Sequence, residues 1–161
     1  MKEITQTYEN PNGCEPAAAL PNHFGAILGF VHDKAPEGAA VIRLELQAGH
    51  CNLQGLVHGG VLMSLLDATG LWAGVPKDQT LPRSATVGMN CSFLKSVKLT
   101  EATALRAEAS VTKQGRSLYF ATISIFDEPN NNLIATAQGI YSSGRTPIRQ
   151  PDAISPRTTF K

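Results

Sequence analysis

The chain lacks an excess of charge of either sign. Its 14 lysines and arginines nearly balance 13 aspartates and glutamates, which leaves a formal net charge of +1 over 161 residues. Proteins that bind nucleic acid through bulk electrostatics carry a clearly basic surface. The balance therefore argues against nucleic acid as a partner, and it still allows a local basic patch for a phosphorylated ligand.

Cysteine is scarce, and no long uninterrupted hydrophobic run is present. Cys14, Cys51 and Cys91 are widely spaced and odd in number, and no CxxC pair occurs. This pattern argues against a disulfide framework and a structural zinc site, so we expect reduced thiols and no metal. The longest apolar stretch, 61–75, contains Asp67 and is too short to span a bilayer. Because the first residues also lack the apolar core of a signal peptide, we expect a cytoplasmic protein that does not engage a membrane.

Length and composition predict one globular domain. The chain is 42% hydrophobic and 17% charged, which is typical of a folded protein, and 161 residues are too few for two ordinary domains. Residues 1–22 are expected to form an irregular lead-in with room for one short helix at Glu15–Leu20. Residues 145–161 contain three prolines, three arginines and no periodicity, so we expect an extension there. The predicted domain is therefore 23–144.

Apolar periodicity divides this domain into strands and one helix. Alternation predicts a hairpin and four further strands, at 25–32, 39–47, 84–93, 103–112, 117–126 and 133–141. Residues 57–73 follow helical spacing instead, with a broad apolar face. The opposite helix face has mostly small residues, where a backbone or a ligand can approach closely: Gly60, Ser64, Asp67, Leu71 and Gly74. This order predicts an α+β fold in which an antiparallel sheet of about six strands wraps around one long central helix.

The start of the predicted helix has the residues of a candidate catalytic site. His58-Gly59-Gly60 precedes the apolar run, and two glycines leave backbone N–H groups uncovered at the helix end that attracts negative charge. Asp67 follows on the same helix. A carboxylate among apolar residues destabilises the folded protein unless it is paired or protonated, so its presence also fits a role in catalysis. The pattern indicates an oxyanion-binding end and an acid–base group on one element.

Spacing on the helix indicates that such a site is shared between two chains. Nine residues of α-helix advance about 13.5 Å and turn about 900°, which places His58 and Asp67 on opposite faces. One copy of the helix cannot bring both groups to the same substrate atom. A two-fold axis can place Asp67 of one chain beside the His58-Gly59 end of its partner, so we expect a composite site in a dimer.

With Asn52 six residues before His58 and Asp67 nine residues after it, the chain resembles the hotdog-fold thioesterases of the phenylacetate-degradation type. The resemblance implies hydrolysis of an acyl-CoA thioester, without metal or organic cofactor, by a homodimer or a dimer of dimers. It implies that Asp67 acts as general base or nucleophile. It further implies that the Gly59 N–H and Asn52 polarise the thioester carbonyl, and that His58 orients substrate near the helix end.

Further site residues follow from the resemblance and from the demands of the substrate. Some members place a serine on the strand after the helix, and Thr86 occupies that place here with an added methyl group. Gly60 belongs to the expected substrate-binding helix start. CoA carries phosphates that need cations or backbone N–H groups, so the turn with Lys113, Gly115 and Arg116 is the candidate for the nucleotide end, with arginines of the extension as competitors.

Simpler interpretations of the same residues remain open. Asp67 can be a structural acid bonded to a neighbouring strand, and Asn52 can cap a turn. His58 can bond to a loop carbonyl, and the glycine pair can allow close packing of the helix on a strand.

The remaining histidines have no metal-ligand spacing, so we expect His23, His32 and His50 at the surface or in turns. Two other functions also stay open. One is a non-catalytic acyl-CoA-binding regulator, and the other is a hotdog dehydratase or hydratase.

Overall fold

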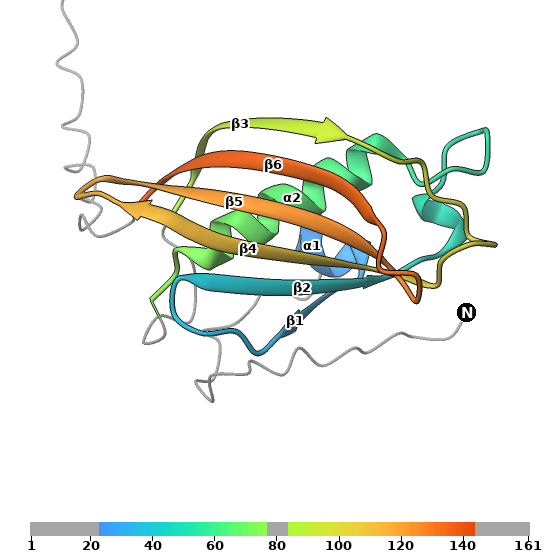
Figure 1. Ribbon diagram of the computed structural model, residues 1–161, viewed down its shortest axis with the longest axis horizontal. Coiled ribbons are helices and arrows are strands. Elements are labelled where there is room, and N and C mark those ends of the chain that lie inside the picture. The colour runs from blue at the N-terminus through green and yellow to red at the C-terminus, as the bar shows by residue number, and fades with distance from the viewer. Residues whose placement is uncertain (1–22, 77–83, 144–161) are drawn as a thin grey trace, which may run out of the picture.

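One antiparallel sheet curves around a single long helix. The computed structural model describes residues 23–76 and 84–143, so the lead-in, the short helix expected at Glu15–Leu20 and the extension lie outside the described residues. The strand order is β1-β2-β4-β5-β6-β3, and the sheet wraps the long helix α2 (Figure 1). The elements are α1 (Phe24–Leu28), β1 (Phe30–Asp33), β2 (Ala39–Glu45), the 3-10 turn η1 (Ala48–His50), α2 (Gly59–Ala73), β3 (Thr86–Phe93), β4 (Ala104–Gln114), β5 (Leu118–Glu128) and β6 (Leu133–Ser142). The expected element order and the wrapped sheet are confirmed.

The first arm of the expected hairpin is partly wrong, because residues 24–28 form α1 rather than a strand. The ring of His23 caps this helix by accepting a hydrogen bond from the backbone N–H of Ala26 at 3.3 Å. Gly29 ends it in the left-handed region at φ 80°, so pairing with β2 begins only at Phe30. Alternation alone missed this helix because its ends are set by a histidine cap and a left-handed glycine.

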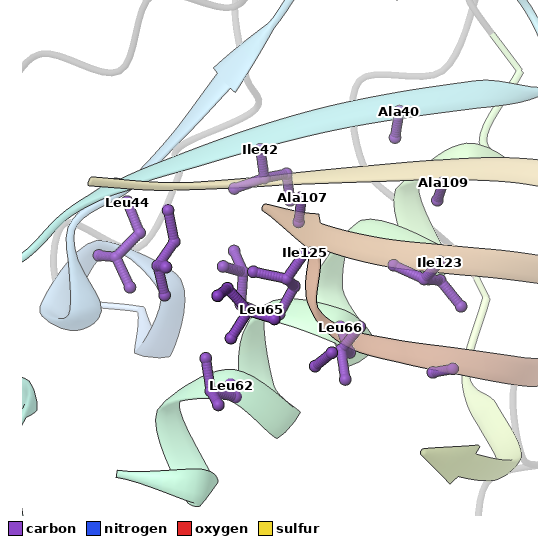
Figure 2. Packing of buried hydrophobic residues seen from close by; sticks show 14 of the residues in the cluster. Ala40, Ile42, Leu44, Leu62, Leu65, Leu66, Ala107, Ala109, Ile123 and Ile125 are labelled. Carbon is purple, nitrogen blue, oxygen red and sulfur yellow. The ribbon is translucent and has the colours of Figure 1, made fainter. Parts of the chain in front are cut away.

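The hydrophobic core fills the space between α2 and the concave face of the sheet. Inward-facing alanines on β4 let the helix lie close to the middle of the sheet, with α2 packed most extensively on β4. Figure 2 shows inward side chains of β2, β4 and β5 directed toward α2, among them the buried residues Ile42, Leu44, Ala107, Ala109, Ile123 and Ile125 against Leu62, Leu65 and Leu66. This packing fixes the helix, and every side chain on it, relative to the strands.

A tyrosine ring occupies part of the small-residue face of α2. At Gly74 an added Cβ would overlap the ring of Tyr119 on β5. The Tyr119 hydroxyl donates a hydrogen bond to the backbone carbonyl of Leu71 at 2.6 Å. The close approach that these small residues predicted therefore exists at this end of the helix, and a side chain from the sheet makes it.

The sheet has one long edge, strand β3. Within residues 23–76 and 84–143, β3 pairs only with β6 and is eight residues long, whereas the opposite edge strand β1 has four residues. Val87 and Phe93 on β3 are 61% and 50% exposed. An edge strand presents unpaired N–H and C=O groups, so β3 offers both backbone donors and apolar side chains to a neighbour.

Candidate active site

The candidate site begins at the first turn of α2, where His58 caps the helix. The Nδ1 atom of His58 accepts a hydrogen bond from the backbone N–H of Gly60 at 2.8 Å, and the carbonyl of His58 accepts from Val61 N–H at 2.9 Å. Because Nδ1 is an acceptor, the neutral ring carries its proton on Nε2. His58 is exposed at the helix start, and its Nε2 forms no hydrogen bond with a described residue.

The two glycines after His58 have different backbone environments. The Gly60 N–H is committed to the His58 ring, and an added Cβ at Gly60 would lie 2.9 Å from Nδ1 of that ring. The Gly59 N–H makes no hydrogen bond within the described residues, and an added Cβ there would meet the Phe93 ring at an ordinary 3.9 Å. Gly59 therefore supplies the open donor at the positive end of the helix.

Asp67 is joined to the neighbouring strand by a short hydrogen bond. The Thr86 hydroxyl donates to Oδ1 of Asp67 at 2.6 Å. Asp67 is half-buried on α2 and makes no salt bridge with a described residue, while Thr86 opens β3 and is exposed. The structure thus brings together two of the expected catalytic residues, with one carboxylate oxygen oriented by a neutral donor.

Asn52 organises the loop before the helix. Its side-chain Oδ1 accepts hydrogen bonds from the backbone N–H groups of Gln54 at 2.9 Å and Leu56 at 3.1 Å. The turn-capping role that the sequence left open is therefore present. With Oδ1 occupied, the amide Nδ2 is the group that this side chain can offer to a ligand.

His50 was expected at the surface or in a turn, and it lies in the turn η1 of the same loop with its side chain buried. His50 is 6% exposed, its carbonyl accepts from His58 N–H at 2.8 Å, and its Nδ1 accepts from Gln47 N–H at 3.1 Å. These bonds fix the chain just before the helix start. This burial could not be predicted from the sequence, because it depends on η1, a three-residue turn without a periodic pattern.

Within one chain the expected site residues form two separate groups. His58, Gly59 and the Asn52 loop lie at the start of α2, and Asp67 with Thr86 lies about 12 Å further along the helix axis, at 1.5 Å per residue. The predicted long helix that carries both groups is confirmed, and the placement of His58 and Asp67 on its opposite faces stays a prediction.

The candidate phosphate turn joins β4 to β5. Lys113 and Arg116 are exposed, and Gly115 is required by the turn, since an added Cβ would lie 2.8 Å from the Leu118 carbonyl oxygen. This hairpin tip lies at the end of the sheet near the C-terminal end of α2, away from the start of that helix (Figure 1). Lys113 also borders a shallow hollow of about 730 Å³ on the outer face of the sheet, with Phe120, Gln138 and Ile140, and Asp67 is not among its lining residues.

Two tyrosines beneath the helix escaped the sequence analysis. Tyr119 on β5 and Tyr141 on β6 stack with ring centroids 5.1 Å apart. Burial raises the pKa of Tyr119 to about 12. A hydrogen bond with Ser84 lowers this pKa, and the negative charge of Asp67 raises it. The pKa of Tyr141 is raised by burial first, then by Asp67 and Tyr119. Both hydroxyls therefore remain protonated at any working pH, close enough to Asp67 to feel its charge.

The comparisons with known proteins agree with this architecture. The family model described as Thioesterase superfamily matches residues 54–134, about half of the chain, from the Asn52 loop through α2 to the start of β6. The chain belongs to the thioesterase superfamily. Its fold is the hotdog fold and its class is thioester hydrolase, which confirms the expected family and the expected enzyme class.

Individual relatives cover most of the domain. Human acyl-coenzyme A thioesterase 13 is 28% identical over 120 residues, covering 74% of this chain and 84% of the relative. The solved structure of zebrafish thioesterase superfamily member 2 is similar at a TM-score of 0.66 and 26% identity, over 78% of this chain and 88% of that one. The structure of the PaaI protein of the phenylacetic acid degradation operon of E. coli shares the fold at a TM-score of 0.65 and 24% identity, over 73% and 81% of the two chains.

None of the described helices has the length and apolar character needed to cross a membrane. Among the same residues, no three histidine, cysteine or acidic side chains are grouped as metal ligands would be. The cytoplasmic location and the lack of a cofactor remain predictions of the sequence.

Proposed function

We propose that this protein hydrolyses an acyl-CoA thioester to a free acid and CoA. Asp67 takes a proton from a water molecule while the water oxygen bonds to the thioester carbonyl carbon. The carbonyl oxygen gains negative charge and accepts a hydrogen bond from the Gly59 N–H. The carbon–sulfur bond then breaks, and the CoA thiolate leaves with the proton held by Asp67, which returns to its ionised form. Direct attack by the Asp67 carboxylate, followed by hydrolysis of the anhydride, uses the same two groups.

The hydrogen bond between Thr86 and Asp67 is the observation that carries this proposal. A general base has to be ionised and correctly oriented at the moment of reaction. The Thr86 hydroxyl, at 2.6 Å from Oδ1, orients one oxygen and leaves Oδ2 for water or substrate. A salt bridge would hold the carboxylate more strongly and reduce its basicity, and the described residues provide none.

The edge strand β3 supports a composite site in a dimer. Thr86, at one end of β3, is bonded to Asp67, and Phe93, at the other end, lies against Gly59. If two copies of β3 pair antiparallel about a two-fold axis, the Thr86 end of one chain meets the Phe93 end of the other. This pairing brings Asp67 toward the partner's helix start and covers the exposed edge. We therefore propose a homodimer, alone or as half of a dimer of dimers.

The other site residues take supporting roles. The Nε2–H of His58 and the Nδ2 of Asn52 are donors available near the acyl group, and Gly60 keeps the His58 ring seated on the helix end. Lys113 and Arg116 extend from the Gly115 turn, and we propose that they bind phosphates of CoA. The name of the human relative, acyl-coenzyme A thioesterase 13, favours the same substrate class.

Release of free thiol from a panel of acyl-CoAs tests the proposal. We expect turnover by the native protein and at least a hundredfold loss in Asp67→Asn, because Asn keeps the shape of the side chain but cannot accept the proton. CoA binding and the melting temperature should stay near those of the native protein. Binding without thiol release by the native protein would identify a regulator instead. Conversion of an enoyl-CoA to a hydroxyacyl-CoA would identify a hydratase.

A further inference from the structure

Three hydroxyl-bearing residues lie in one row across the concave face of the sheet. Thr86 on β3 is the register partner of Tyr141 on β6, and Tyr141 is the register partner of Tyr119 on β5. Thr86 donates to Asp67, and Tyr119 donates to the Leu71 carbonyl of the same helix. All three side chains therefore face α2, with Tyr141 between the two whose hydroxyl partners are on the helix.

Tyr141 is exceptional because its hydroxyl is buried without a partner. The side chain is 0% exposed, and among the described residues its hydroxyl forms no hydrogen bond. A buried polar group without a partner destabilises the folded protein, whereas phenylalanine would fill the same space at no such cost. The hydroxyl therefore contributes nothing visible to the fold of the protomer.

The sequence also provides the room that this hydroxyl occupies. Added Cβ atoms at Gly70 on α2 and at Gly139 on β6 would both overlap the Tyr141 hydroxyl. A glycine inside a helix costs about 1 kcal/mol relative to alanine. The chain thus carries two glycines beside one unpartnered hydroxyl, which is an arrangement that packing alone does not require.

The hydroxyl lies next to the proposed base. Gly70, which it contacts, is three residues after Asp67, and residues at this spacing are neighbours on a helix surface. The negative charge of Asp67 raises the pKa of Tyr141, as it does that of Tyr119. From β3 the polar neighbour of Asp67 is Thr86, and from β5 and β6 the titratable neighbours are these two tyrosines.

We propose that Tyr141 is a positioning residue for the reaction, whose buried hydroxyl stabilises the ionised carboxylate of Asp67 from the sheet side. This inference rests on the function proposed above. Thr86 orients Oδ1 directly, while the O–H dipole of Tyr141 favours negative charge on the carboxylate from the buried side. Because Tyr141 is fully buried in the protomer, the proposed effect is exerted through Asp67.

Tyr141→Phe tests the inference, with Tyr119→Phe as the matched control in the same ring stack. In Tyr141→Phe we expect kcat to fall about three- to tenfold, and the acid limb of the pH–rate profile to move up by about half a pH unit, because a hydroxyl that favours the ionised carboxylate is lost. KM should stay constant, and the melting temperature should be unchanged or higher. Tyr119→Phe should lower the melting temperature, since it breaks the bond to Leu71, and should leave the acid limb in place.

A second measurement separates this inference from the proposed function. The titration midpoint of the Asp67 carboxyl, followed by carbon NMR, should rise in Tyr141→Phe even if no substrate is turned over. A native protein that releases no thiol would refute the proposed function, and the NMR titration would still report on Tyr141. An unchanged midpoint, or a fall in melting temperature equal to that of Tyr119→Phe, would overturn the positioning role.

Discussion

Replacing Thr86 with valine removes one hydrogen bond from the proposed base and changes little else. Valine has the shape and the β-branch of threonine, so strand β3 keeps its local preference. The bond that disappears is the 2.6 Å contact from the Thr86 hydroxyl to Oδ1 of Asp67. Hydrogen bonds to charged groups contribute about 1.5–3 kcal/mol. Because Thr86 is exposed and Asp67 only half-buried, the lower end of this range applies.

A loss of about 1.5 kcal/mol in the transition state corresponds to about a tenfold lower rate. We expect this loss in kcat measured by thiol release at saturating acyl-CoA, with KM unchanged, because the hydroxyl orients the base and does not bind the nucleotide. Thr86→Ser keeps the donor and should stay within about threefold of the native rate. The melting temperatures of both variants should match the native value. If Thr86→Val retained more than half of the native kcat, the hydrogen bond would have no part in catalysis.

Three further outcomes are expected. Mixed dimers of Asp67→Asn and Gly59→Pro chains, each inactive alone, should regain activity, because one shared site then has an intact Asp67 and an intact Gly59. Proline is tolerated at the first helical position, so Gly59→Pro removes only the N–H donor. No recovery despite measured subunit exchange would exclude a shared site. Replacing Lys113 and Arg116 with alanine should raise KM for acyl-CoA more than for a short thioester without the nucleotide, and equal changes would indicate a disturbed turn instead. Burial, with a smaller contribution from a neighbouring histidine, lowers the pKa of His32 to about 4, below its unfolded value of about 6.5. His32 therefore contributes stability that is present above pH 6.5 and is lost as the pH falls toward 4. The melting temperature of His32→Phe should decline less over this interval than that of the native protein.

Periodicity was sufficient for the long elements of the fold. The apolar spacing from Val61 to Ala73 and the alternation along β4, β5 and β6 correctly predicted one helix and an antiparallel sheet, since each pattern covers several turns or residue pairs. The predictions were weaker where a single contact decides the structure. α1 is capped by the ring of His23, and η1 buries His50 through bonds made within four residues.

The candidate site shows the same division. His58, Gly59 and Asp67 became candidates because of their residue types and their spacing on one predicted helix, whereas Thr86 was named only because of the resemblance to the family. Tyr141 lies 74 residues after Asp67, and only the register of β3 with β6 brings it near. Gly70, the helix glycine that meets Tyr141, was not singled out from the sequence. Gly74 marked a close approach without revealing that the side chain that makes it is Tyr119.

The hydrogen bond between His58 and Gly60 has a consequence for how this motif tolerates change. The donor proposed at position 59 is a backbone group, and an added Cβ there makes only ordinary contact with Phe93, so within the protomer alanine or serine can replace Gly59 with the donor intact. At position 60 the His58 ring occupies the place of a side chain, so a replacement would displace the cap even though the Gly60 amide remains. A library randomised at both positions should therefore return varied small residues at 59 and almost only glycine at 60. The second glycine of the pair, which is not the proposed oxyanion donor, is the one that the helix start constrains.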